Sequence, residues 1–154
     1  MKRLLTLALA LFVASPALAQ DVIVNGIHII HPYITAPAPG SMSGAAYLVV
    51  ANEGATADRF DAVETDIAMM AALHNTEFGA DGVARMYELP PIPLAPGETV
   101  SFEPGGAHIM LMMLNAELNV GDMVPMTLSF QNAGEIVVEF EVMARDPNAP
   151  AMSH

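Results

Sequence analysis

Two side chains that can bind a soft metal ion lie two residues apart late in the chain. His108 and Met110 follow a glycine turn at 104–106 and belong to an apolar run that predicts a β-strand. Successive side chains of a strand point to opposite faces, so these two project from one face, about 7 Å apart along the backbone. An imidazole nitrogen and a thioether sulfur in this arrangement are suited to binding one soft or borderline metal ion.

A predicted hairpin supplies two further ligands of the same kinds. Its turn contains Gly-Ala-Asp-Gly at 79–82, which favours a short connection between antiparallel strands. With an odd-numbered loop such as 78–82, His74 lies directly opposite Met86, with Cβ atoms about 5 Å apart; a one-residue shift places Asn75 there instead. Two imidazoles and two thioethers form an uncharged, four-coordinate set that prefers Cu(I) to Cu(II) or Zn(II). The predicted metal ligands are therefore His74, Met86, His108 and Met110.

The spacing of these four residues carries a family resemblance. Counted in order, the residues between successive ligands number eleven, twenty-one and one. This pattern resembles the copper motif of the periplasmic copper chaperone family PCu(A)C, and the likeness covers essentially the whole chain after the leader. Further family-like stretches are His31-Pro32, Gly44-Ala45-Ala46-Tyr47, Asp58-Arg59, Gly82-Val83-Ala84-Arg85-Met86, Pro104-Gly105-Gly106 and Thr127-Leu128-Ser129-Phe130.

The resemblance implies both a fold and a function. The fold would be an all-β, cupredoxin-like Greek-key barrel or sandwich. The function would be that of a chaperone without catalytic turnover, which binds Cu(I) at an accessible site and passes it on. In the family the recipient is usually the binuclear CuA centre of cytochrome c oxidase subunit II, with Sco-type assembly proteins acting nearby.

The chain departs from the family's pattern at two places. Asn75 follows the first histidine, where methionine or glutamate is common, and Tyr33-Ile34-Thr35 stand where tryptophan and arginine are common. Neither change removes a ligand, although both would alter partner recognition. Met152 and His154 resemble a much reduced form of the histidine- and methionine-rich C-terminal extension that binds a second copper in some members.

Short apolar or alternating runs, separated by glycine, proline and Asp/Asn turns, are typical of an all-β sandwich or barrel. Irregular structure is expected from His31-Pro32 onward, because prolines exclude central-strand pairing, and again in a turn-rich link at 90–97. Strands are expected at 22–30 with a break at 25–26, and at 44–52, 59–65, 69–78, 83–89, 99–102, 107–114, 126–130 and 135–143.

The N-terminus has the features of a cleaved export signal. Lys2 and Arg3 precede an apolar run at 4–13, and a small-x-small site at 17–19 precedes Gln20. The expected organisation is a signal peptide at 1–19, a copper-binding β-barrel domain at 20–145 and a short flexible tail at 146–154. The apolar run is too short to span a membrane and no later stretch is long enough, so we expect a periplasmic protein without a membrane anchor.

The composition narrows the range of partners. The net charge is −12, and a surface this acidic repels nucleic acid and anionic lipid. Cysteine is absent, which excludes thiol chemistry, thiolate metal ligands and the cysteine-dependent blue-copper site. The chain contains 12 methionines, whose thioethers bind monovalent copper and are not lost to disulfide formation.

Other functions stay open beside the copper chaperone. A periplasmic copper buffer or resistance protein would share the site but lack a dedicated acceptor. A β-sandwich interaction module without metal would make the four residues coincidental, and each of them alone has an ordinary structural explanation. Met112 continues the face of His108 and is expected to be core packing, the alternative being a reserve thioether ligand. His28 and His31 are expected to be structural or solvent-facing.

Overall fold

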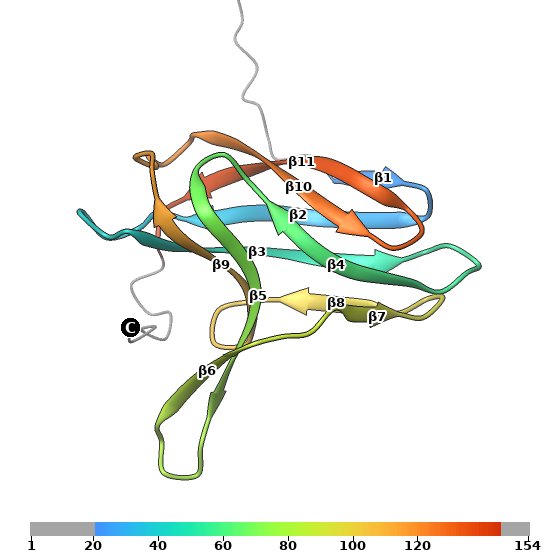
Figure 1. Ribbon diagram of the computed structural model, residues 1–154, viewed down its shortest axis with the longest axis horizontal. Coiled ribbons are helices and arrows are strands. Elements are labelled where there is room, and N and C mark those ends of the chain that lie inside the picture. The colour runs from blue at the N-terminus through green and yellow to red at the C-terminus, as the bar shows by residue number, and fades with distance from the viewer. Residues whose placement is uncertain (1–20, 146–154) are drawn as a thin grey trace, which may run out of the picture.

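The computed structural model describes residues 21–145. The predicted signal peptide at 1–19, Gln20 and the tail at 146–154 with Met152 and His154 lie outside the described residues. The described part is all-β, as expected (Figure 1). The strands are β1 (Val22–Val24), β2 (Ile27–Thr35), β3 (Ser43–Asn52), β4 (Asp58–Glu64), β5 (Ala68–Phe78), β6 (Ala84–Glu88), β7 (Ile92–Leu94), β8 (Thr99–Phe102), β9 (Ala107–Leu114), β10 (Met123–Phe130) and β11 (Gly134–Met143).

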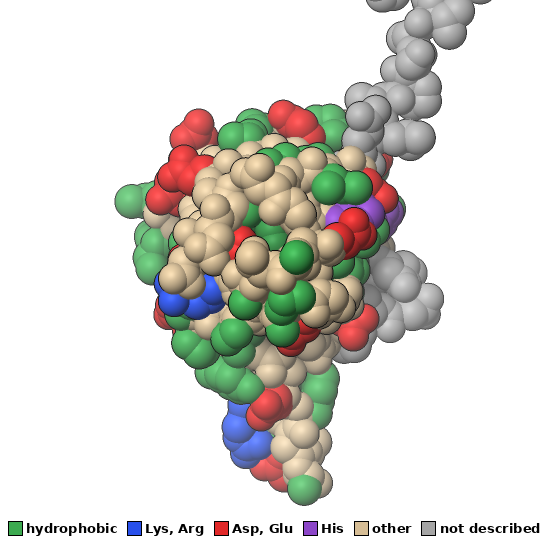
Figure 2. Space-filling model, turned by 90° about the vertical axis from the view of Figure 1, so that its right-hand side faces the viewer, with side chains coloured by type: hydrophobic (Ala, Val, Ile, Leu, Met, Phe, Trp, Pro, Cys, Tyr) green, Lys and Arg blue, Asp and Glu red, His purple; other side chains and the backbone are tan. Residues whose placement is uncertain are grey.

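The strands form one continuous sheet that folds back on itself. The order is β6-β5-β9-β3-β2-β11-β10-β4-β7, with β1 added to β2 and β8 added to β3. Only β11 and β2 run parallel among the pairings of the described chain. The β5–β6 hairpin extends away from the rounded body, as Figures 1 and 2 show. No helix within residues 21–145 is long and apolar enough to cross a membrane.

One face of β5 and β9 packs against the hydrophobic core, and the other face carries the predicted ligands. Leu73 of β5 and Ile109 and Leu111 of β9 belong to the buried apolar cluster. Farther along the same core, the rings of Phe60 and Phe130 stack with centroids 4.9 Å apart. Because side chains alternate along a strand, the neighbours of Leu73 and Ile109 in sequence face away from this core. Those neighbours include both histidines of the predicted site.

Three expectations about prolines were wrong. Strand β2 continues through His31-Pro32 to Thr35, because the register with β3 shifts between Ile30 and Tyr33 and the proline falls inside this irregularity. His31 has a φ of 50°, which accompanies the shift. The link at 90–97 contains the short strand β7, which pairs with β4. Strand β10 begins before Met126 and includes Pro125, at a point where β10 pairs with β11 but not yet with β4.

Candidate metal centre

The central strands of the site are β5 and β9, which place two histidines side by side. His74 and His108 are direct partners in the antiparallel ladder, one step beyond the core pair Leu73 and Ile109. Their ring centroids lie 6.1 Å apart, with 53° between the ring planes. Their positions in sequence did not predict this pairing. The structure therefore brings together two of the four predicted ligands more directly than expected.

The ring of His108 is held in one tautomer by the preceding turn. Its Nδ1 lies 3.0 Å from the carbonyl oxygen of Gly106, which only accepts hydrogen bonds, so Nδ1 carries the proton and donates it. The lone pair is then on Nε2, which is buried and has no hydrogen-bond partner within residues 21–145. An imidazole that donates one N–H to a backbone carbonyl and presents its other nitrogen is the usual arrangement of a metal-binding histidine.

His74, like His108, has a ring nitrogen without a hydrogen-bond partner among the described residues. Nδ1 of His74 is buried and has no hydrogen-bond partner in the described part of the chain. A buried polar atom left unpaired costs about 1–3 kcal/mol, so two such nitrogens on paired residues need an explanation. A metal ion bound between the rings would give both nitrogens a partner. The donor atoms present at this face therefore fit a metal ion.

Burial keeps His108 in the form that a metal ion requires. Its side chain is 0% exposed. Burial lowers the pKa of His108, the hydrogen bond to Gly106 opposes this change, and the electrostatic interaction with His74 lowers the pKa further. The net shift is downward, so the ring is neutral at neutral pH and its Nε2 lone pair is available.

The thioether of Met110 lies on the same face, next to the histidine pair. Met110 pairs with Ala72 on β5 and with Ala45 on β3, and its side chain is only 8% exposed. Alanine on both sides leaves the long methionine side chain room on this face. As predicted, His108 and Met110 share a face because they lie two residues apart on one strand.

The predicted pairing of His74 with Met86 was wrong by two residues. His74 pairs with Glu88, and Met86 pairs with Thr76. The loop still has five residues, but it spans 79–83: Gly79 N–H donates to the carbonyl of Val83, and the N–H of Val83 donates to the Asp81 carboxylate.

A shift of two residues preserves the face of every side chain. Met86 therefore remains on the same face as His74, as its diagonal neighbour across the strands, at a typical Cβ separation of about 7–8 Å. The alternative pairing of Asn75 with Met86 does not occur, since Asn75 pairs with Tyr87. All four predicted ligands thus lie on one face of β6, β5 and β9, with Met86 at the sheet edge.

Two residues on this face were missed from the sequence. Thr76 is buried opposite Met86, and its hydroxyl has no hydrogen-bond partner within residues 21–145. Glu88 is exposed opposite His74. Only a correct register would have revealed either residue. Among the described residues, no three His, Asp or Glu side chains group closely enough to hold a metal ion.

Hydrogen bonds on the opposite face of the hairpin support its register. The Asn75 side-chain amide donates to the Tyr87 hydroxyl at 3.0 Å, and that hydroxyl donates to the Glu77 carboxylate at 2.6 Å. Nearer the tip, Arg85 and Asp81 form an ion pair at 2.7 Å. These contacts connect β5 to β6 and so position Met86 relative to His74.

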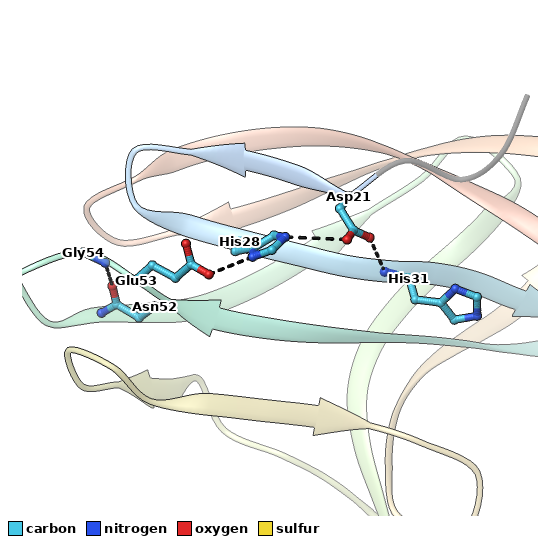
Figure 3. A network of polar contacts seen from close by, with 6 residues as sticks. All are labelled: Asp21, His28, His31, Asn52, Glu53 and Gly54. Atoms are coloured by element: carbon cyan, nitrogen blue, oxygen red, sulfur yellow. Dashed lines mark hydrogen bonds and ion pairs between the residues drawn. The ribbon is translucent and has the colours of Figure 1, made fainter.

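The other two described histidines lie apart from this site, on β2 (Figure 3). His28 is 2.8 Å from the Glu53 carboxylate through Nδ1 and 3.8 Å from Asp21 through Nε2. The backbone N–H of His31 donates to Asp21. These contacts tie the start of the described chain to the β3 end, which agrees with the structural role expected for His28.

Fold and site together define an all-β domain of the cupredoxin-like class, with a histidine pair and thioethers on one outer face. The chain belongs to the family described as "LpqE-like: Putative lipoprotein LpqE-like", whose profile matches residues 27–142. This membership, with the structural likenesses that follow, confirms the resemblance to PCu(A)C proteins. A search of the curated proteins finds no match.

Several solved structures share the fold. The structure described as the apo PCuAC domain from PmoF1 has a TM-score of 0.71 and 29% identity, over 82% of this chain and 100% of that one. The copper-bound PCuAC domain from PmoF2 has a TM-score of 0.69 and 28% identity, over 82% and 99%. The solution structure of CuI-DR1885 from Deinococcus radiodurans has a TM-score of 0.60 and 26% identity, over 87% and 86%.

Proposed function

We propose that this chain is an exported copper chaperone that binds Cu(I) and delivers it to an acceptor protein. The ligands are His74, Met86, His108 and Met110. The observation that carries the proposal is the pair of buried imidazole nitrogens, His74 Nδ1 and His108 Nε2, without partners in residues 21–145. Thioethers on the same face complete a soft, uncharged set that suits a monovalent ion.

The similar structures support copper as the cargo. One of them is a copper-bound PCuAC domain and another is a CuI protein, and both align over most of this chain. Export is supported by the signal-like leader and by the lipoprotein description of the family. We propose the periplasm as the compartment, 20–145 as the functional domain, and Met152 and His154 in the tail as weaker ligands for a second copper.

The position of Met86 suggests how transfer takes place. Met86 is half-buried on β6, the terminal strand of the sheet, whereas His108 is fully buried on β9. An incoming acceptor ligand reaches the edge thioether first and replaces it, while the histidines still hold the ion. The ion keeps its oxidation state, and no substrate bond is made or broken, so the transfer requires no catalysis. We propose the CuA centre of cytochrome c oxidase subunit II as the acceptor, with Sco-type proteins acting nearby.

A competition experiment tests the site. The exported chain is titrated with Cu(I) against a chromophoric chelator, and the titration is repeated with His108→Ala and Met86→Leu. Both variants should lose at least about tenfold in affinity, equivalent to about 1.4 kcal/mol. His31→Ala, an exposed histidine away from the site, is the matched control and should compete like the parent. Equal competition by all variants would show that the assigned ligands are wrong.

A transfer assay separates the chaperone from a copper buffer. The Cu(I)-loaded chain is mixed with a soluble CuA domain, and the acceptor's absorption is followed after oxidation. Formation of the CuA spectrum supports delivery. An unchanged spectrum, with copper retained by the donor, would favour a buffer or resistance protein.

A further inference from the structure

A second pair of thioethers lies on the same face of β5 and β9, one step beyond the proposed copper ligands. Met70 and Met112 are direct partners in the antiparallel ladder, so their Cβ atoms are about 5 Å apart. On its other side Met112 pairs with Ser43, a small residue. Met112 follows Met110 by two residues, which places the two thioethers on one face about 7 Å apart along the strand.

Exposure increases steadily along this row of ligands. His108 is 0% exposed and Met110 is 8% exposed, Met112 is half-buried, and Met70 is 53% exposed. His108 and Met110 are buried, so the accessible groups of this row are the thioethers beyond them. Met70 and Met112 provide two accessible soft ligands next to Met110.

The surroundings of Met70 also favour a cation. Met70 lines an open groove together with Met69 and Ala72 and with three acidic residues, Glu64, Asp66 and Glu88. Negative charge near a thioether raises the local concentration of cations. The same charge would not strengthen an apolar packing contact. Met70 is also too exposed to serve mainly as a core-packing residue.

We propose that Met70 and Met112 form a second, weaker position for a soft monovalent cation, through which Cu(I) passes on its way to the histidine pair. This inference rests on the proposed copper function. Flexible thioethers exchange ligands readily, so the ion can contact Met110 before it leaves Met112. Repulsion between two cations on the same face disfavours occupation of both positions at once. The second position is therefore occupied only at higher metal concentration.

Silver(I), a redox-stable stand-in for Cu(I), tests the inference. The exported chain, labelled with 13C at the methionine methyl groups, is titrated with Ag(I) and followed by NMR. The first equivalent should shift Met86 and Met110, and a later equivalent should shift Met70 and Met112. The double variant Met70→Leu/Met112→Leu should bind one Ag(I) fewer than the parent and keep the first step unchanged. Met69→Leu removes a 71% exposed thioether that lines the same groove but alternates to the other face of β5, and it should behave like the parent.

Other outcomes separate the two proposals. A normal first step without response of Met70 and Met112 overturns the inference and leaves the copper site intact. The same conclusion follows if all later equivalents shift only Met152, or if the double variant binds as many ions as the parent. A response of Met70 and Met112 without response of Met86 and Met110 would overturn both the proposed ligand set and the transit role.

Discussion

Replacing His108 by leucine should remove copper binding and yet leave the metal-free protein at least as stable. In most buried positions a substitution destabilises the fold. At His108 the parent already carries the cost of an unpaired Nε2, about 1–3 kcal/mol. Leucine removes that cost and has a similar size.

His108→Leu also loses the hydrogen bond made by Nδ1, but the stability lost with it is small. His108→Leu breaks the Nδ1–H bond to the Gly106 carbonyl, which is worth about 1 kcal/mol. That carbonyl keeps a partner, because it also accepts the backbone N–H of Thr76 at 3.1 Å. The net change is then about 0–2 kcal/mol in favour of the variant. For a domain of this size, each 1 kcal/mol corresponds to a rise of roughly 4 °C in Tm.

Urea unfolding measures this effect, in the presence of a metal chelator and again with Ag(I). Without metal, the midpoint for His108→Leu should equal or exceed that of the parent with an unchanged m value. With one equivalent of Ag(I), the parent should gain more stability than His108→Leu, since a ligand stabilises the state that binds it. Ile109→Ala, the adjacent core residue, serves as a control and should lose about 2–5 kcal/mol under both conditions. A loss above about 1 kcal/mol for metal-free His108→Leu would refute the reasoning about the unpaired nitrogen.

Three further perturbations probe the surroundings of the site and the fold. Ala72→Leu should fill the space beside Met110 and weaken Cu(I) affinity by about tenfold, measured by chelator competition. Tyr87→Phe should break the hydrogen bond from Asn75 and increase amide exchange in β6. Burial tends to raise the pKa of Asp58, but three backbone N–H donors outweigh it, so the net pKa is lowered. The stability that Asp58 adds is therefore present above about pH 4 and is lost as pH falls through its folded pKa. Asp58→Asn should reduce this acid-dependent loss in urea unfolding.

Each of these predictions has a contrary result. Unchanged affinity in Ala72→Leu would mean that Met110 does not need the space beside Ala72. Exchange in β6 that matches the parent would show that the tyrosine hydroxyl does not hold the hairpin. An Asp58→Asn variant with the same stability loss below pH 4 as the parent would place the acid-sensitive group elsewhere.

Much of the architecture was predictable because it depends on local pattern. Alternation of side chains and turn residues predicted most of the strands, including both limits of β9 (Ala107–Leu114). The expected strand limits were wrong at Pro32 and Pro125, because the exclusion of proline from strands applies only to regular central strands. A register shift and an unpaired strand edge accommodate these two residues, and neither feature can be seen from composition.

By itself the sequence determined the types of candidate ligand and the face on which each strand presents them. Residues two apart on a strand share a face whatever the strand pairs with, so the prediction that His108 and Met110 share a face was correct. An odd-numbered hairpin loop kept His74 and Met86 on a common face even though the predicted partners were wrong. The family motif added the spacing that connects the two pairs.

Only the tertiary structure decided how the strands meet. The pairing of His74 with His108 joins residues far apart in the chain, and it follows from the core packing that aligns Leu73 with Ile109. The hairpin register depends on the N–H of Val83 bonding to Asp81 and so joining the loop. No local pattern reports either register, because each results from contacts made between strands once the sheet has formed.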